Sequence, residues 1–375
     1  MKKLFVFAAA AVAVLAACTK NEVNQTPDQA ITFQIANYSA QTKAPTSLIT
    51  EGFNSFKSYA WYTPATGTAN QAFMTPATIE YDNTNTPAIW HATDRTYFWP
   101  KTGYVNFFSF AGNHYPTTVS LNASNCVEVA YTDVEIATSD NILAANGAYG
   151  FFSNPNATYG HNGVEKGVPT LFRHMLSKVK FDVKVDATEV SDNKNKWEVV
   201  IDSAIVSYRD QGTLTFSYPA TPAITFDANG KPTTAGVTQS FNTPVWTPKN
   251  VKNDTLSKKS SVVTTFALGG AVSTIVPLIN ESVVMPQNLD PTTGTNVTIR
   301  LRYTITHTYN DANPIVETVP VAEKTLISFD NHIDAWVPNT IYTYHIIIKP
   351  NGEILFDPAV EEWVAESTEP SYTIL

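Results

Sequence analysis

Alternation of apolar and polar positions is the clearest pattern in this chain. Residues 179–186 alternate Val or Phe with Lys or Asp, and residues 297–305 and 342–348 repeat the period of two. Successive side chains of a β-strand point to opposite faces of a sheet, so this period predicts strands with one buried and one solvent-facing side. These three segments are therefore expected to form layers of a β-sandwich.

Shorter segments with the same character predict further strands at 31–35, 55–62, 97–99, 104–110, 126–131, 140–144, 197–208, 212–218, 261–268 and 282–285. Thr, Val, Ile, Tyr and Phe are plentiful, and Pro and Gly interrupt the chain throughout, which is typical of many short strands. We find no long 3.6-residue apolar stripe, which argues against a βαβ plan. The sequence predicts an all-β fold, and two β-sandwiches in tandem are the economical arrangement.

The chain exceeds one comfortable hydrophobic core, so two domains are expected. The predicted parts are a signal peptide at 1–17, a polar tether at 18–29, one sandwich at 30–175, a second at 176–350 and an extended tail at 351–375. The tail is apolar enough to dock on protein, and Asp357-Pro358 is expected to break its extended segment.

The N-terminus has the layout of a bacterial lipoprotein signal. Lys2 and Lys3 precede an apolar run that is too short to span a bilayer, and the run ends in Leu15-Ala16-Ala17-Cys18. This ending resembles a lipobox, which implies that Cys18 is acylated and becomes the first mature residue. Thr19 follows instead of Asp, so the resemblance implies the outer membrane. The alternative is an ordinary secretory signal with a chance cysteine.

Charge and cysteine content exclude some partners. Removing residues 1–17 takes away two lysines and no acidic residue, which moves the net charge from −9 to −11. Such a chain is a poor ligand for nucleic acid and lacks a polybasic membrane patch, so membrane attachment must come from the lipid. With Cys18 acylated, Cys126 is the one remaining cysteine and no intramolecular disulfide is possible.

A series of short segments runs in order along nearly the whole mature chain. They are the Cys18 lipobox, Ile31-Thr32-Phe33, Thr42-Lys43-Ala44, Tyr97-Phe98-Trp99-Pro100, Val105-Asn106-Phe107-Phe108-Ser109, residues 172–179, Met285-Pro286-Gln287, Trp336-Val337-Pro338-Asn339-Thr340 and residues 357–363. Together they resemble the fimbrillin family, the two-domain pilins and pilus-like lipoproteins of Gram-negative gut and oral anaerobes. The resemblance implies two transthyretin-like β-sandwiches and a surface-exposed fimbrial role in adhesion.

The resemblance also implies assembly by strand exchange with like or related pilin subunits. A protease removes the first strand after a basic residue, and the opened groove accepts a strand from a neighbour. The residues in these roles are the plug strand Ile31, Phe33 and Ile35, the cleavage site between Lys43 and Ala44, and the donor strand Ile354, Phe356 and Val360. Some members have Arg where this chain has Lys43, which places cleavage by an Arg-specific protease in question.

Two other interpretations stay open. The first strand and the tail could remain in their own subunit, which would give a non-polymerising lipoprotein or a tip or base subunit. The protein could instead bind a host or bacterial surface glycan or protein, with exposed aromatic rings stacking on sugars. Trp90 and Trp246, beside Pro-rich loops, are the aromatic residues expected to be exposed.

Motifs for catalysis, cofactors or metals are not found. The sequence has no phosphate-binding Gly-rich loop, no Gly-x-Ser-x-Gly and no His-Glu-x-x-His, and its seven histidines are scattered. Adjacent Glu361 and Glu362 would face opposite sides of a strand, so they do not form a catalytic pair. A non-enzymatic protein without a cofactor is expected.

The lipobox predicts one outcome for native protein. Intact mass and N-terminal analysis should find acylated Cys18 on anchored, unprocessed chains and Ala44 on chains activated for polymer growth. Cys18→Ser should abolish the acyl mass and the membrane-bound fraction, whereas the control Cys126→Ser should change neither. Acylation that survives Cys18→Ser would contradict the lipobox.

Overall fold

The computed structural model describes residues 30–36, 52–65, 70–84, 89–100, 102–150, 167–192, 194–220, 228, 237–249, 254–289, 297–309, 313–325 and 333–363. All regular structure in these ranges is β, which confirms the expected all-β class. No helix in these ranges is long and apolar enough to cross a membrane.

The strands are numbered along the chain. They are β1 (Phe33–Ala36), β2 (Ser55–Thr63), β3 (Gln71–Asp82), β4 (Ile89–Ala92), β5 (Tyr104–Gly112), β6 (Thr118–Leu121), β7 (Val127–Glu135), β8 (Ile142–Ala145), β9 (Gly147–Gly150), β10 (Val168–His174), β11 (Ser177–Val185), β12 (Asn195–Tyr208), β13 (Gln211–Tyr218), β14 (Val237–Gln239), β15 (Val245–Pro248), β16 (Asp254–Leu268), β17 (Val276–Val284), β18 (Gln287–Asn288), β19 (Thr298–Tyr309), β20 (Asn313–Thr325), β21 (Ala335–Trp336), β22 (Thr340–Ile348) and β23 (Ile354–Glu362).

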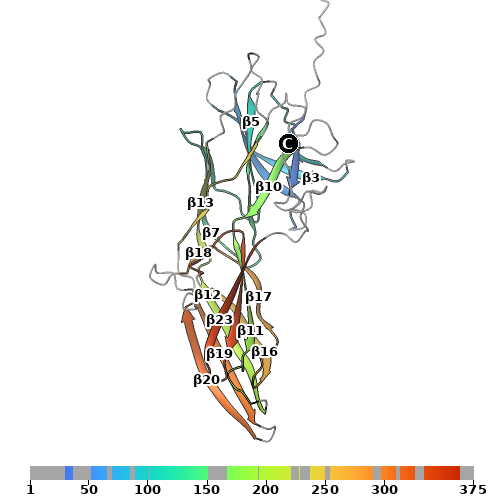
Figure 1. Ribbon diagram of the computed structural model, residues 1–375. Helices are drawn as coiled ribbons and strands as arrows, with labels where there is room; N and C mark the ends of the chain where they lie inside the picture. Colours follow the sequence, from blue (N-terminus) through green and yellow to red (C-terminus); the bar gives the residue numbers. More distant parts are fainter. Residues whose placement is uncertain are drawn as a thin grey trace, which may run out of the picture.

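The strands form two bodies along one long axis (Figure 1). In the first body, a nine-stranded sheet has the order β14-β9-β5-β2-β3-β4-β1-β10-β8, and β8 also pairs with β5. This additional pairing closes seven of the strands into a hydrogen-bonded ring. The ring encloses one apolar cluster, to which Phe33, Phe56, Trp90 and Phe107 contribute.

A second, four-stranded sheet covers one side of this ring, with the order β15-β13-β7-β6. Strand β5 lies between the two layers, and all nine of its residues are buried. Its Phe107 side chain belongs to the cluster inside the ring, whereas Phe108 and Phe110 belong to the cluster between the layers. Burial on both faces explains why β5 does not alternate between apolar and polar residues, although it includes the buried polar residues Asn106 and Ser109.

The second body consists of two four-stranded sheets, β17-β11-β22-β23 and β16-β12-β19-β20. The inward positions of their alternating strands form the largest apolar cluster. Strand β11 runs parallel to β22 and antiparallel to β17. This body contains the three segments that alternate most strictly in the sequence, residues 179–186, 297–305 and 342–348. They alternate because each of these strands has one face towards the core and one face away from it.

Strand pairing crosses the boundary expected at residue 175. Strands β13 and β15 join β7 in the first body, and β14 pairs with β9 there, although all three follow β12 of the second body in the chain. The chain therefore leaves the first body after β10, returns to it with β13, β14 and β15, and leaves it again with β16. Periodicity does not reveal such a return, because it carries no information about which strands pair.

Some local expectations differ from the structure. Residues 97–99 form no strand beyond an isolated bridge between Ala30 and Phe98. Strand β23 continues through Pro358 to Glu362, so Asp357-Pro358 does not break it. Proline is tolerated there because β23 is the last strand of its sheet and needs hydrogen bonds on one side alone.

The two bodies meet in a buried junction. Met175 and Leu176, which connect β10 to β11, pack in the cluster of the first body together with Trp363, which follows β23. The Ser177 hydroxyl donates to the Val337 carbonyl at 2.6 Å, and the Trp246 indole N–H donates to the Met175 carbonyl at 2.8 Å. The junction is therefore tied by backbone carbonyls as well as by apolar contact.

Trp363 and His174 form the centre of this junction. The indole stacks on the His174 imidazole with ring centroids 3.6 Å apart and planes 9° apart, and the Lys178 ammonium lies 4.3 Å from the indole centroid. The backbone N–H of Trp363 donates to the Asn339 carbonyl at 2.8 Å. Burial, together with the charge of Lys178, lowers the His174 pKa from 6.5 to about 3, so the imidazole is neutral at pH 7.

This lowered pKa predicts acid sensitivity. The unfolded chain takes up the His174 proton near pH 6.5 but the folded chain does so only near pH 3, so stability is complete above pH 6.5 and falls as the pH drops towards 3. The slope from this group is about 1.4 kcal/mol per pH unit. Urea unfolding between pH 7.5 and 4 should show a shallower pH dependence for His174→Gln than for wild type. His91→Gln, outside the junction, is the control, and equal slopes for wild type and His174→Gln would contradict the assignment.

Candidate functional site

Strand β1 occupies a slot between two strands of the ring. It runs parallel to β10, with Phe33 opposite Val168 and Ala36 opposite Leu171, and antiparallel to β4, with Phe33 opposite Trp90. The Val168 N–H donates to the Thr32 carbonyl at 2.8 Å. In the sheet order, β4 and β10 meet only through β1, so this short strand closes the ring.

The three predicted plug residues lie inside the ring. Ile31, Phe33 and Ile35 are 4%, 4% and 3% exposed and belong to its apolar cluster. The Phe33 ring makes edge-on contacts with Phe56 and Phe107, at centroid distances of 5.5 and 5.6 Å. Each side chain contributes about 1.5–3 kcal/mol of burial free energy. Detaching β1 would leave an apolar groove whose two walls carry unpaired backbone groups.

Close backbone packing holds β1 against β10. A Cβ atom added to Gly167 would lie 2.5 Å from the Phe33 carbonyl carbon and 2.7 Å from its Cα. Only glycine leaves the room that this approach requires. The backbone of the plug strand therefore packs against Gly167, the residue immediately before β10.

The predicted donor residues lie on the second body of their own chain. Strand β23 pairs antiparallel with β22, from Ile354 opposite Ile348 to Glu362 opposite Thr340. Ile354 and Phe356 are 5% and 8% exposed in the core, whereas Val360 is 54% exposed. Within the described part of the tail, β23 is thus paired with a strand of its own subunit. Cys18, Lys43 and Ala44 lie outside the described residues.

The two tryptophans expected to be exposed do not form a sugar platform. Trp90 is 1% exposed and packs between Phe56 and Tyr81, so the expectation that its ring is exposed was wrong. The alternation of β4 turns its side chain into the ring, which a neighbouring proline-rich loop does not reveal. Trp246 is half-buried and directs its N–H to the Met175 carbonyl. Neither indole is a freely exposed stacking surface.

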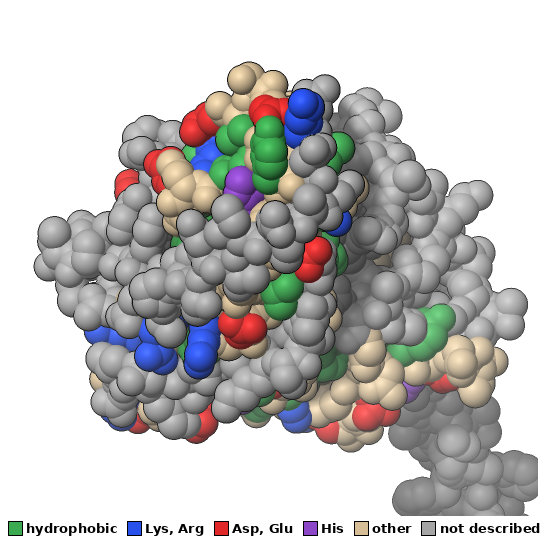
Figure 2. Space-filling view, turned by 90° about the horizontal axis from the view of Figure 1, so that it is seen from below, with side chains coloured by type: hydrophobic (Ala, Val, Ile, Leu, Met, Phe, Trp, Pro, Cys, Tyr) green, Lys and Arg blue, Asp and Glu red, His purple; other side chains and the backbone are tan. Residues whose placement is uncertain are grey.

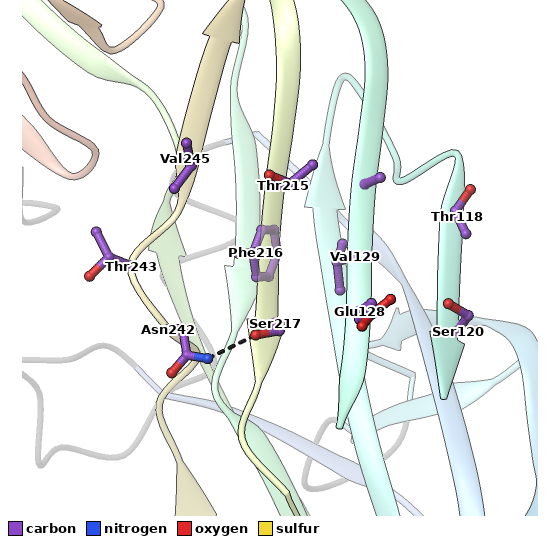
Figure 3. Close-up of a pocket in the computed structure, with 11 residues that line it drawn as sticks. Thr118, Ser120, Glu128, Val129, Thr215, Phe216, Ser217, Asn242, Thr243 and Val245 are labelled. Atoms are coloured by element: carbon purple, nitrogen blue, oxygen red, sulfur yellow. Dashed lines mark hydrogen bonds between the residues drawn. The ribbon is translucent and has the colours of Figure 1, made fainter. Parts of the chain in front are cut away.

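A shallow hollow of about 460 Å³, lined by apolar as well as polar side chains, lies on the outer sheet of the first body (Figure 3). Ser120, Glu128 and Ser217 stand side by side on β6, β7 and β13, and the Asn242 amide donates to the Ser217 hydroxyl at 2.8 Å. These groups offer hydrogen bonds and one carboxylate. The described residues include no group of three or more His, Cys, Asp or Glu side chains placed to hold a metal ion.

The far end of the second body carries exposed apolar side chains, including Phe266, Leu268 and Tyr309. The Lys196 ammonium lies 4.5 Å from the centroid of the Phe266 ring and covers part of it. Viewed from this end, hydrophobic side chains lie among charged and polar ones (Figure 2). This mixed surface does not resemble the buried, continuous apolar lining of the β1 groove.

Comparison with known proteins assigns the chain to a family. The sequence model of the fimbrillin-like family matches residues 42–363. This match spans most of the chain, from just before β2 to Trp363, so the chain belongs to the fimbrillin-like family. No curated protein matches the chain.

Among solved structures, the chain is similar to a fimbrial protein from Bacteroides vulgatus, with a TM-score of 0.46, 12% identity and coverage of 89% of this chain and 100% of that one. It is also similar to a proposed cell adhesion protein from Parabacteroides distasonis, with a TM-score of 0.45, 9% identity and coverage of 89% and 99%. A proposed cell adhesion protein from Bacteroides uniformis has a TM-score of 0.36, 15% identity and coverage of 91% and 100%. The family assignment rests on the sequence model.

The packing of Phe33 predicts a large stability effect. Phe33→Ala removes a buried ring from the centre of the closed ring of strands and should lower the free energy of unfolding by about 3–5 kcal/mol. Phe98→Ala is the matched control, because Phe98 is 45% exposed and its replacement should cost less than about 0.5 kcal/mol. Chemical denaturation measures both, and equal effects would show that β1 is not part of the core.

Proposed function

We propose that this chain is a surface fimbrial subunit, or a tip or anchor protein of a fimbrium, that acts in cell adhesion through β-strand exchange. In this proposal Cys18 carries the lipid that holds it to the outer membrane, and its partners are like or related pilin subunits. The work is done by backbone pairing and apolar burial, so neither catalysis nor a cofactor is required.

One observation carries the proposal. Strand β1 is a short N-terminal strand that alone joins β4 to β10, and it buries three alternating apolar side chains. A strand with matching alternation could take its place, because the groove offers both hydrogen-bonding edges and apolar pockets. Of the first and last strands that the structure describes, β1 has two hydrogen-bonded neighbours and β23 has one.

The proposal includes the organisation of the chain. In this proposal the two bodies are two sandwich domains of transthyretin-like type, and β13, β14 and β15 belong to the first. Strand β23 is the donor strand, and it pairs with β22 of its own subunit until exchange. Cleavage between Lys43 and Ala44 detaches β1. The docked position of β23 suits a subunit before exchange, and a subunit that stays uncut would cap or anchor a fibre.

Limited proteolysis tests this function. A Lys-specific protease acting on the mature chain should cut after Lys43, release the segment with β1, and give a ladder of multimers on a non-boiled gel. Lys43→Gln should prevent both effects, whereas the control Lys20→Gln, upstream of the plug, should leave the ladder unchanged. A product cut after Lys43 that stays monomeric would contradict strand exchange.

A further inference from the structure

The hollow on the outer sheet of the first body contains two parallel rows of side chains, which cross the sheet from β6 to the β15 side (Figure 3). The rows are two residues apart along β6, β7 and β13, so they point to the same face and lie about 6.6 Å from each other. One row is polar, and the other is rich in methyl groups. Such a surface suits a ligand that has an apolar face bordered by hydroxyl groups.

The polar row is fixed by hydrogen bonds. Strand pairing sets Ser120 opposite Glu128 and Glu128 opposite Ser217. The Asn242 side-chain amide donates to the Ser217 hydroxyl at 2.8 Å, and the Asn242 backbone N–H donates to the Ser217 carbonyl at 2.8 Å. The Ser217 hydroxyl accepts in this contact and keeps its own proton for another acceptor. The row therefore offers donors and acceptors in fixed positions.

The Glu128 carboxylate is held in place by the turn that joins β6 to β7. One of its oxygens accepts from the Asn122 side-chain amide at 2.9 Å. The Asn122 side-chain oxygen in turn accepts from the backbone N–H groups of Ser124 and Cys126, at 2.9 and 3.0 Å. The second Glu128 oxygen remains as an acceptor, and a carboxylate accepts hydrogen bonds from hydroxyl groups more strongly than a neutral oxygen does.

The second row explains why the sheet is hollow at this place. Ala130 lies between Thr118 and Thr215 on the neighbouring strands, and Thr215 lies opposite Val245. The short Ala130 side chain forms a low floor between two longer ones. Val245 is 55% exposed at the border of the hollow, although its side chain is apolar. The row thus presents methyl groups to solvent beside the polar row.

We propose that this hollow binds a neutral glycan. The methyl row matches the C–H face of a sugar ring, and the polar row matches its hydroxyl groups, with Glu128 as the strongest acceptor. Glu128 is the one charged residue among the described residues that line the hollow, and the chain has a net charge of −9, so an anionic ligand is repelled. The volume of about 460 Å³ lies within the range of small-ligand sites.

This site is separate from the groove of β1. The β1 side chains pack inside the ring of strands, whereas the hollow lies on the outer face of the sheet that covers the ring. Glycan binding therefore requires neither cleavage nor displacement of β1. The proposal goes beyond strand exchange, and it gives the same subunit a surface for adhesion.

An array of immobilised neutral and acidic oligosaccharides tests the site with the full, uncleaved chain, because multivalent display detects weak binding. The wild type should bind neutral oligosaccharides, and calorimetry with the strongest soluble hit then gives its affinity. Ala130→Tyr fills the hollow from its floor and should lower this affinity by about tenfold or more. Glu128→Gln should lower it by about tenfold, because a neutral acceptor replaces a charged one.

Thr247→Tyr is the matched control. Thr247 is exposed on the same face of β15 but does not line the hollow, so this variant should bind as the wild type does. Thermal unfolding checks that each variant is folded. Glu128 is exposed, so Glu128→Gln still tests the site if Ala130→Tyr proves unstable.

The possible results separate the two proposals. Absence of binding to every neutral oligosaccharide would overturn the glycan site, and so would binding that Ala130→Tyr and Glu128→Gln leave unchanged. Binding confined to acidic oligosaccharides would contradict the selection by charge and overturn the proposal. Each of these results leaves strand exchange standing, because the chain is not cleaved in this experiment.

Discussion

The first body depends on the seating of one four-residue strand. β1 provides the only connection between β4 and β10 in the sheet order, and its Phe33 side chain brings rings from β2 and β5 into contact. Hydrogen bonding and apolar burial thus coincide in the same residues. Removing the strand would open the ring at one position and would leave the other strand pairs in place, which distinguishes it from loss of a central strand such as β5.

The second body and the junction determine how firmly the tail is held. β23 has one hydrogen-bonded neighbour, but Trp363 fixes its end between His174 and Lys178, beside the first body. The two groups interact with the indole in different ways. The neutral His174 imidazole stacks parallel to it, and the Lys178 ammonium places a positive charge near the ring. Release of the tail therefore requires both loss of a strand edge and withdrawal of a buried indole.

The sequence predicts a strand reliably when one face of the strand is buried and the other faces solvent. Strands β11, β19 and β22 have this character, and their alternation predicts both type and sidedness. The sequence analysis does not predict strands β3 and β20, and each contains an internal proline. In the structure, Pro76 and Pro320 lie where the register slips by one residue, at β-bulges that tolerate a missing donor.

The candidate site was partly predictable for a related reason. The alternation of Ile31, Phe33 and Ile35 indicates a buried face, and the resemblance to fimbrillins supplies its role as a plug. The parallel pairing with β10 and the close approach at Gly167 depend on segments far apart in the chain, which local patterns do not encode. Trp90 shows the opposite failure, because its proline-rich neighbourhood suggested a surface position for a core residue.

The return of β13, β14 and β15 to the first body affects the order in which a nascent chain matures. Strand β7 lacks its neighbour β13 until the polypeptide has been extended past its midpoint. The aromatic layer around Phe108 and Phe110 would meanwhile face solvent on one side. A chain synthesised from its N-terminus would thus keep this layer uncovered until β13 has been made, which makes the layer a natural place for folding chaperones to act.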